Sequence, residues 1–391
     1  MDTGVCRWGI LGTAGIARKN WQALALSGNS ALVAVASRSL DRARQFVAGC
    51  QAACPLPSAP AAVGSYDELL TRPDVDAVYI PLPTGLRKEW VLQAAGAGKH
   101  VLVEKPVGVT AADVRDMLAA CERDRVQLMD GVMFVHSRRL DALRRTLDDG
   151  ESVGRVRRIA SQFSFNAPES FVRENIRGDS RLEPHGCLGD LGWYNIRFAL
   201  WVMKHEMPTE VTARLLAAAG RRDEVPFEMS AEMLFPGGVS ASFYCSFRTE
   251  NEQWATVSGT KGFVHVSDFV LPFFGDEVRF EVTNSVYQVA GCDFDMQRRT
   301  RSVVVPEYSN SHPTAQEANM FRAFSDLVVT NRRDPRWGDI ALRTQVVMDA
   351  CAQSAKSGRP VSLAGDPLLP GRTAANVGAA FTITGERELP R

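Results

Sequence analysis

The sequence predicts an α/β protein in two parts: an N-terminal Rossmann-like domain around a parallel sheet, and a C-terminal α+β domain with a large, mostly antiparallel sheet. Up to about residue 135, short apolar runs alternate with helical stretches, as in β-α-β units. Beyond about residue 150, apolar and polar residues alternate with the period of half-buried strands. A chain of 391 residues also exceeds one ordinary core, so two domains are expected.

Five strands are expected in the N-terminal domain, at 6–11, 32–36, 77–82, 101–104 and 126–134. Between the last two, Thr110 followed by Asp113 predicts a capping box at the start of a helix. Apolar residues then recur at helical spacing, at Val114, Met117, Leu118 and Cys121. We expect this helix to cover one face of the sheet.

The C-terminal domain begins with a strand whose alternate residues are Ile159, Ser161, Phe163 and Phe165. Hairpins are expected to turn at 236–238 and at 260–262, because alternating strands flank these glycine-containing turns. Helices are expected near 192–204, 315–329 and 339–356. The predicted division is therefore 1–135, 136–365 and a C-terminal tail at 366–391 that is rich in Pro, Gly and Ala.

Charge and cysteine usage exclude several classes of protein. The 45 Lys and Arg residues balance 45 Asp and Glu residues, which argues against nucleic acid or an anionic membrane surface as a partner. No apolar run approaches the roughly 18 residues of a membrane span, and the N-terminus lacks the features of a secretory signal. Cys50 and Cys54 have no second pair downstream, so neither a metal site nor a disulfide framework is expected. Reduced thiols favour a cytoplasmic location.

The first strand ends in a glycine-rich loop, Gly9-Ile-Leu-Gly12-Thr-Ala14-Gly15-Ile-Ala17. Small residues between a strand and a helix allow a dinucleotide pyrophosphate to sit on the free amides of that helix. The residues expected at the cofactor are Gly12, Thr13, Ala14, Gly15 and Ile16. Ala14 replaces the second glycine of the usual pattern, and Gly15 could compensate for its methyl group. A glycine-rich turn can also serve only to pack the helix closely.

The end of the second strand indicates which dinucleotide binds. An NAD-binding domain usually has an acidic residue there for the ribose hydroxyls. This chain instead has Ser37 and Arg38, with Arg42 one turn later. Guanidinium groups pair well with the 2′-phosphate of NADP, so NADP is expected and NAD is less favoured. The alternative is that Arg38 is a solvated loop residue.

Lys105 stands at the carboxyl end of the fourth strand, within Glu104-Lys105-Pro106. Ligands of open α/β sheets bind in the crevice at this edge, so the lysine is a candidate catalytic group. A lysine near the cofactor ring can assist proton transfer by a neighbouring phenol. A surface lysine at a strand end is the alternative.

With Trp8-Gly-Ile-Leu-Gly12 and Tyr79-Ile-Pro-Leu-Pro83, the Glu104-Lys-Pro106 motif resembles the Gfo/Idh/MocA oxidoreductase family over about residues 5–365. The resemblance implies cofactor contacts at Pro81, Leu82, Pro83, Glu104, Lys105 and Pro106. It also implies a lysine beside the nicotinamide, often followed by a cis proline peptide. Gly189-Asp190-Leu-Gly192-Trp-Tyr194 resembles the family's second motif, in the version that ends in tyrosine.

The resemblance implies a role for each of three catalytic residues. Tyr194 would exchange a proton with the substrate oxygen while hydride moves to or from the cofactor. Lys105 would stabilise the phenolate or the developing alkoxide. Asp190 would orient the substrate or pair with Lys105, and its four-residue spacing from Tyr194 places both side chains on one helix face.

The chain departs from many family members where it reads Thr84-Gly-Leu-Arg87 in place of Asn-x-x-His. Arg87 would change a cofactor or substrate contact, unless it faces solvent. His136 could bind substrate hydroxyls from the end of the fifth strand, or it could link the two domains. Further residues that could reach the substrate are Phe165, Asn166, Arg181 and His185.

The expected function is NADP(H)-dependent hydride transfer to or from a carbinol carbon of a sugar, polyol or related cyclic alcohol. A redox-neutral, nicotinamide-dependent glycoside hydrolase or lyase is one alternative. A non-enzymatic cofactor-binding regulator is another, because fold alone does not fix function. The expected partner besides the small-molecule substrate is the chain itself, in a dimer or tetramer.

Overall fold

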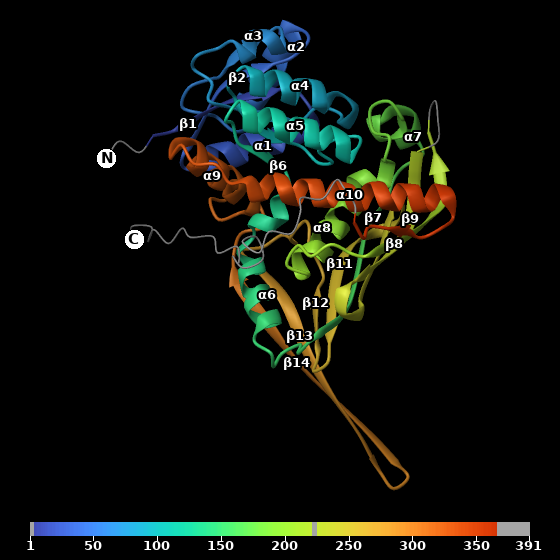
Figure 1. The fold of residues 1–391 in the computed structure, drawn as a ribbon. Coiled ribbons are helices and arrows are strands. Elements are labelled where there is room, and N and C mark those ends of the chain that lie inside the picture. Colours follow the sequence, from blue (N-terminus) through green and yellow to red (C-terminus); the bar gives the residue numbers. More distant parts are fainter. Residues whose placement is uncertain (1–3, 221–224, 366–391) are drawn as a thin grey trace, which may run out of the picture.

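The computed structural model describes residues 4–220 and 225–365, so the expected tail at 366–391 lies outside the described residues. Sheet A of the N-terminal domain has six parallel strands in the order β3-β2-β1-β4-β5-β6 (Figure 1). These strands are β1 (Cys6–Leu11), β2 (Ser30–Ala36), β3 (Ala61–Val63), β4 (Ala77–Ile80), β5 (His100–Val103) and β6 (Leu128–Asp130). The strand order reverses between β1 and β4, which is where doubly wound sheets open a ligand crevice.

The expected strand at 126–134 is wrong in its length. β6 stops at Asp130, and a 3-10 helix, η1 (Met133–His136), follows. The chain leaves the sheet at Gly131, where a Cβ would lie 3.1 Å from a carboxylate oxygen of Glu104. β3 was not expected, because three residues are too few for an alternating pattern to be recognised.

Helices flank sheet A on both faces. They are α1 (Gly15–Leu26), α2 (Leu40–Ala53), α3 (Tyr66–Leu70), α4 (Thr84–Gly96) and α5 (Ala111–Arg123). The capping box of α5 is confirmed, since the Asp113 amide donates to Thr110 Oγ1 at 3.1 Å and Asp113 Oδ2 accepts from the Thr110 amide at 3.2 Å. The predicted apolar face of this helix is buried at Val114, Met117 and Cys121.

Two C-terminal helices, α9 (Gln316–Val329) and α10 (Pro335–Ser357), return to the N-terminal domain (Figure 1). The indole nitrogen of Trp8 donates to Ser325 Oγ at 3.0 Å, and the Trp8 ring packs on Phe321 and Phe324. The core of the first domain is thus completed from the end of the chain. The division at residue 135 remains a prediction.

Sheet B of the C-terminal domain has nine strands in the order β14-β13-β12-β11-β7-β10-β9-β8-β15. Neighbours are antiparallel except for β10 and β7. The strands are β7 (Val156–Asn166), β8 (Glu210–Ala219), β9 (Val225–Phe235), β10 (Val239–Ser246), β11 (Arg248–Gly259), β12 (Phe263–Val266), β13 (Glu277–Ala290), β14 (Asp293–Pro306) and β15 (Val361–Ser362). The two expected hairpins are confirmed as β9–β10 and β11–β12.

The helices of the C-terminal domain lie over one face of sheet B and around its upper end (Figure 1). They are α6 (Arg138–Asp148), α7 (Ser170–Glu174), the 3-10 helix η2 (Ile176–Gly178), the π-helix η3 (Leu188–Gly192) and α8 (Trp193–Val202). The 3-10 turn η4 (Pro236–Gly238) joins β9 to β10 beside the start of β7. α10 begins four residues earlier than expected, because the Asp334 side chain caps it and Pro335 occupies its first turn. No helix among residues 4–220 and 225–365 is long and apolar enough to cross a membrane.

A buried ion pair fixes the two domains to each other. Arg197 of α8 donates to Asp130 of β6 at 2.5 Å and to Thr344 Oγ1 of α10 at 2.8 Å. The two charged side chains are at most 1 % exposed. Residues from both domains and from the C-terminal helix α10 therefore meet beside Asp130, the last residue of β6.

Candidate active site

The glycine-rich loop has a shape that requires glycine at its first turn. Gly12 has φ +116°, and a Cβ there would lie 3.0 Å from Leu82 Cδ2. The loop after β1 and the loop after β4 are therefore in contact at the point where the strand order reverses. Leu82, between Pro81 and Pro83, lies beside the crevice expected at this point of the sheet.

The first turn of α1 is open to a ligand. Ala14 occupies the N-cap position and has no side-chain oxygen with which to cap the helix amides. Gly15 has open space where a Cβ would be, and the Ile16 side chain is 41 % exposed. Thr13 is half-buried beside them. The uncapped amides and the space beside Gly15 fit a bound pyrophosphate.

Two cations lie near this loop, one after β2 and one at the start of α2. Arg38 and Arg42 are exposed, whereas Ser37 is buried and its amide donates to the Val63 carbonyl at 3.1 Å. Burial raises the pKa of Tyr66, and the charges of Arg38 and Arg42 partly offset that rise. Tyr66 also lies beside the Gly12 turn. This tyrosine was not predicted from the sequence, since no motif marks the short helix α3.

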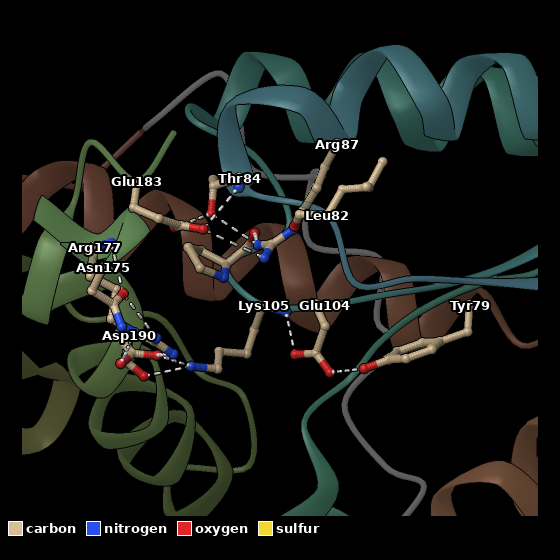
Figure 2. Close-up of polar contacts among 11 residues, drawn as sticks. Tyr79, Leu82, Thr84, Arg87, Glu104, Lys105, Asn175, Arg177, Glu183 and Asp190 are labelled. Carbon is tan, nitrogen blue, oxygen red and sulfur yellow. Dashed lines mark hydrogen bonds and ion pairs between the residues drawn. The ribbon is translucent and has the colours of Figure 1, made fainter. Parts of the chain in front are cut away.

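Lys105 is held at the carboxyl end of β5 by an acidic residue from the other domain (Figure 2). Its Nζ donates to Asp190 Oδ1 at 2.8 Å and to the Asp190 carbonyl at 2.7 Å. The peptide bond between Lys105 and Pro106 is cis. Both charged side chains keep some exposure, 10 % for Lys105 and 14 % for Asp190. The expected pairing of these two residues is present.

Arg177 of η2 is a second cation on the same carboxylate, and it was not predicted from the sequence. Its Nε donates to Asp190 Oδ2 at 2.5 Å and its Nη2 to Oδ1 at 3.1 Å (Figure 2). Burial alone would raise the pKa of Asp190, but the charges of Arg177 and Lys105 outweigh it and hold that pKa well below its usual range. The cluster therefore carries two positive charges and one negative charge. Arg177 lies in a three-residue 3-10 helix without a motif, so no sequence signal could have found it.

Tyr194, on the first turn of α8, lies against the Lys105 ammonium. The Lys105 Nζ is 4.7 Å from the centre of the Tyr194 ring, and the phenol donates to Met133 Sδ at 3.5 Å. Burial, together with the charges of Glu104 and Asp190, raises the pKa of Tyr194 well above its usual value. The phenol is therefore protonated at neutral pH.

Asp190 sits in a π-helical turn rather than in a regular α-helix, which differs from the expected helix start. Gly189 makes this turn possible, because a Cβ there would lie 3.1 Å from Pro106 Cγ and 2.9 Å from His185 Cβ. The turn thus packs directly on the loop that carries Lys105. Such π-turns are frequent at functional sites.

Glu104 stabilises the base of the site and does not bind the Lys105 ammonium. Its carboxylate accepts from the Tyr79 hydroxyl at 2.6 Å and from the Lys105 backbone amide at 3.3 Å (Figure 2). Tyr79 in turn accepts from Asn20 Nδ2 of α1 at 2.6 Å. This chain links α1, β4 and the lysine loop below the crevice.

Arg87 does not face solvent, so that alternative is wrong. It is 5 % exposed and donates to the Leu82 carbonyl at 2.7 Å, to Thr84 Oγ1 at 3.0 Å and to the Pro106 carbonyl (Figure 2). Glu183, which precedes the π-turn, accepts from the Thr84 amide at 3.1 Å and from Thr84 Oγ1 at 2.6 Å. Arg87 and Glu183 therefore join the two cofactor-side loops to the segment that carries Asp190.

The remaining substrate candidates lie in different surroundings. His136 is 2 % exposed and its ring stacks on Trp337 at 4.9 Å, a placement that fits a link between domains. His185 Nε2 is 2.7 Å from the Val109 carbonyl, beside the lysine loop. Phe165 packs on the rings of Phe171 and Phe247, and Asn166 and Arg181 are exposed. The structure brings Lys105, Asp190 and Tyr194 together and places His136 in the core.

A parallel sheet of this strand order, with a glycine turn at its crevice and a lysine, an aspartate and a tyrosine in contact beside it, defines a dinucleotide-dependent oxidoreductase. Residues 6–132 match the model of the oxidoreductase family with an NAD-binding Rossmann fold, and residues 140–265 match the GFO/IDH/MocA C-terminal domain. The chain belongs to the GFO/IDH/MocA family of oxidoreductases.

Relatives with named activities come from several organisms. Trans-1,2-dihydrobenzene-1,2-diol dehydrogenase of Mus musculus is 33 % identical over 68 % of this chain and 76 % of its own length. The dTDP-3,4-didehydro-2,6-dideoxy-alpha-D-glucose 3-reductase of Saccharopolyspora spinosa is 32 % identical over the same shares. Among solved structures, the 3-ketoreductase KijD10 of Actinomadura kijaniata, in complex with NADP and TDP-benzene, has a TM-score of 0.73 and 26 % identity. That alignment covers 90 % of this chain and 98 % of KijD10.

Proposed function

We propose that this chain is an NADP(H)-dependent oxidoreductase that transfers a hydride between the nicotinamide and a carbinol carbon of a sugar, polyol or related cyclic alcohol. The observation that carries the proposal is the contact of Lys105 with both Asp190 and Tyr194 at the crevice of sheet A. The named relatives support the substrate class, since they act on a cyclic diol and on a keto sugar nucleotide.

The charge balance of the cluster suits a developing alkoxide. Lys105 and Arg177 together carry one more positive charge than Asp190 neutralises. Such a surplus, held in place before the reaction, stabilises negative charge that appears on a substrate oxygen. Asp190 keeps the ammonium oriented, and Arg87 and Glu183 keep the two loops in register.

Tyr194 supplies the proton in the reductive direction. Its raised pKa keeps the phenol protonated, so it can donate to the substrate oxygen. The nicotinamide supplies or accepts the hydride when the dinucleotide is bound. In the oxidative direction the phenol must lose its proton first, and the cations of Lys105 and Arg177 would favour that loss.

The cofactor proposal rests on the loops that follow β1, β2, β4 and β5. Gly12, Thr13, Ala14, Gly15 and Ile16 would hold the pyrophosphate, and Ser37, Arg38 and Arg42 would hold the 2′-phosphate. Pro81, Leu82, Pro83, Glu104 and Pro106 would line the nicotinamide half. The solved complexes of KijD10 contain NADP, which supports NADP over NAD.

A substrate panel tests the function. Purified protein would be mixed with cyclic diols, polyols, aldoses and keto sugars, with each dinucleotide, and the absorbance of the reduced nicotinamide followed. We expect net cofactor turnover that matches product formation. Product formed without net cofactor change would instead support the redox-neutral hydrolase or lyase, and cofactor binding without any turnover across the panel would support the regulator.

A variant tests the cofactor. Arg38→Ala should lower kcat/KM for NADP by roughly 10- to 100-fold, because one charged hydrogen bond is lost, and leave the value for NAD nearly unchanged. Arg44→Ala is the matched control, since Arg44 lies on the same helix as Arg42 and its side chain is 65 % exposed. Equal losses with both dinucleotides would contradict the 2′-phosphate contact.

We also propose a homo-oligomer, a dimer or a tetramer, in the cytoplasm. The eight cysteines are all free thiols, and six of them are buried, which suits a reducing compartment.

A further inference from the structure

A cavity of about 260 Å³ lies where α1 packs against α9 (Figure 1). Residues of both helices line it, together with the loop of residues 310–312 that leads from β14 into α9. Cavities that hold drug-sized ligands measure roughly 300–1,000 Å³, so this one suits a molecule with a single ring. The first turn of α1 is open for the dinucleotide, so the cavity lies beside the proposed cofactor site.

The floor of the cavity is apolar, because small side chains line it from both helices. Ala23 of α1 is one of them, and Ala315 and Ala318 at the start of α9 are the others. Each of the three residues is at most 6 % exposed. Their methyl groups leave room that a larger side chain would fill, and they form a surface on which the C–H face of a ring can pack.

The rim of the cavity carries hydrogen-bond donors, and the loop at the rim is held in place. Ser311 Oγ donates to Gln22 Oε1 at 3.0 Å, which leaves the amide NH2 of Gln22 as a donor. The His312 ring stacks on Tyr308 at 3.8 Å, and its Nδ1 accepts from the Thr314 amide at 3.2 Å. The proton of the neutral imidazole is therefore on Nε2. Gln22 and His312 can both donate to oxygen atoms of a ligand.

One ion pair supplies the fixed charges of the cavity. Lys19 Nζ is 2.5 Å from Glu317 Oε1, and the side chain of Glu317 is 6 % exposed. Within the described part of the chain, these two are the lysine, arginine or acidic residues that line the cavity. Because their charges cancel, the cavity has no surplus cation for a phosphate or a carboxylate. A neutral ligand with hydroxyl groups suits it better, since an ammonium donates to hydroxyls and a carboxylate accepts from them.

This ion pair also connects the cavity to the catalytic cluster. Burial is the main cause of the raised pKa of Tyr194, and the charge of Glu317 adds to it. On the other side of the pair, Asn20 follows Lys19 in α1 and donates to the Tyr79 hydroxyl at 2.6 Å, below the lysine loop. The cavity and the catalytic cluster are therefore neighbouring sites.

We propose that the cavity between α1 and α9 is a subsite for a second sugar ring, and that the substrate is a disaccharide or related glycoside whose reacting ring lies at Tyr194. This inference rests on the proposed function and narrows its substrate class. Gln22, His312 and the pair of Lys19 and Glu317 bind the hydroxyl groups of the second ring, and the alanines pack on its C–H face. Binding energy from this remote ring helps to hold the reacting ring in place.

Steady-state kinetics on matched sugars test the proposal. Each monosaccharide that is active in the panel would be compared with its methyl glycoside and with disaccharides that contain it, as glucose with methyl glucoside, maltose and cellobiose. We expect kcat/KM for at least one disaccharide to exceed the monosaccharide value by roughly 10-fold or more, mainly through a lower KM. The methyl glycoside should behave like the monosaccharide, because it has no second ring.

Variants locate the preference in the cavity. Ala23→Phe fills it and should reduce the ratio of the disaccharide value to the monosaccharide value to about one. Ala25→Phe is the matched control, since Ala25 is exposed on the same helix and does not line the cavity; it should keep the wild-type ratio. His312→Phe keeps a ring for Tyr308 to stack on but removes the N–H donor, and should raise KM for the disaccharide by roughly 3- to 10-fold. Circular dichroism would show whether each variant keeps its fold, and His312→Phe decides if Ala23→Phe does not.

The outcomes separate the subsite from the proposed function. If no sugar in the panel turns over with either dinucleotide, the proposed function fails, and the subsite with it. If monosaccharides turn over but wild type shows no preference for any disaccharide, the subsite is wrong and the function stands. The same conclusion follows if the preference persists undiminished in both Ala23→Phe and His312→Phe, or if a sugar nucleotide is preferred to every disaccharide equally in wild type and variants.

Discussion

Two charged clusters join the N-terminal domain to the rest of the chain, and they differ in charge balance and in access to water. In one, Arg197 and Asp130 pair one to one and are at most 1 % exposed. In the other, Asp190 faces two cations, and the side chain of Arg177 is 36 % exposed. A buried ion pair with no net charge leaves no charged group for a ligand to contact. An accessible cluster with one surplus positive charge does leave such a group. Charge balance and access thus distinguish a structural contact from the proposed catalytic one within a single interface.

The largest expected effect is on the free energy of unfolding, when the buried ion pair of Arg197 and Asp130 is broken. Arg197→Met would leave Asp130 buried without its cation, and should lower the free energy of unfolding by about 3–5 kcal/mol. Urea unfolding followed by tryptophan fluorescence measures this. Replacing both partners, as Arg197→Met/Asp130→Leu, should recover most of the loss. If Arg197→Met lowered the free energy of unfolding by less than about 1 kcal/mol, the pair would resemble an exposed salt bridge in energy, and the proposed difference between the two clusters would be wrong.

Lys105→Met tests the accessible cluster of Lys105, Asp190 and Arg177. We expect kcat to fall by roughly 100- to 10,000-fold, because the cation beside the reacting oxygen and the phenol is lost. The urea midpoint should hardly move, since Asp190 keeps Arg177 as its partner. Lys88→Met on α4 is the control and should retain activity. Undiminished turnover in Lys105→Met would refute the catalytic assignment.

Arg177→Met should have a smaller effect, roughly a 10-fold loss of kcat/KM, since this guanidinium is partly screened by water. With one cation fewer, the pKa of Asp190 should rise, so the acidic limb of the pH profile should move to higher pH. Arg177→Lys should restore part of the activity. An unchanged pH profile would show that Arg177 acts only through the fold.

The smallest expected effect is on the pH dependence of stability, through His136, which lies close to the buried Arg197–Asp130 ion pair. Burial, followed by the charge of Arg197, lowers the pKa of His136 from 6.5 to about 3. Because the folded pKa is depressed, its contribution to stability is complete above about pH 6.5 and is lost as the pH falls toward 3. At pH 5.5 the cost is about 1.4 kcal/mol. His136→Phe should flatten this part of the stability curve, as urea unfolding at several pH values would show.

Local patterns predicted the N-terminal domain and the lysine motif well. Thr110 and Asp113 lie three residues apart, and the β9–β10 hairpin turns within three residues, so both could be seen in the sequence. Arg177 and Tyr66 could not, because they reach the site through tertiary packing from segments with no motif. The long β13–β14 hairpin was not predicted either, since residues 285–299 of this ribbon are exposed on both sides and have no burial pattern of their own.

The return of α9 to sheet A has a consequence for biosynthesis. Trp8 meets Ser325 across 317 positions of chain. At ribosomal rates of about 5–20 residues per second, Trp8 waits roughly 15 to 60 s for its partner to be made. During that interval the indole, which is fully buried in the finished molecule, is exposed on the nascent chain. The core of the nucleotide-binding domain, although this domain is synthesised first, is therefore completed only when α9 has been made.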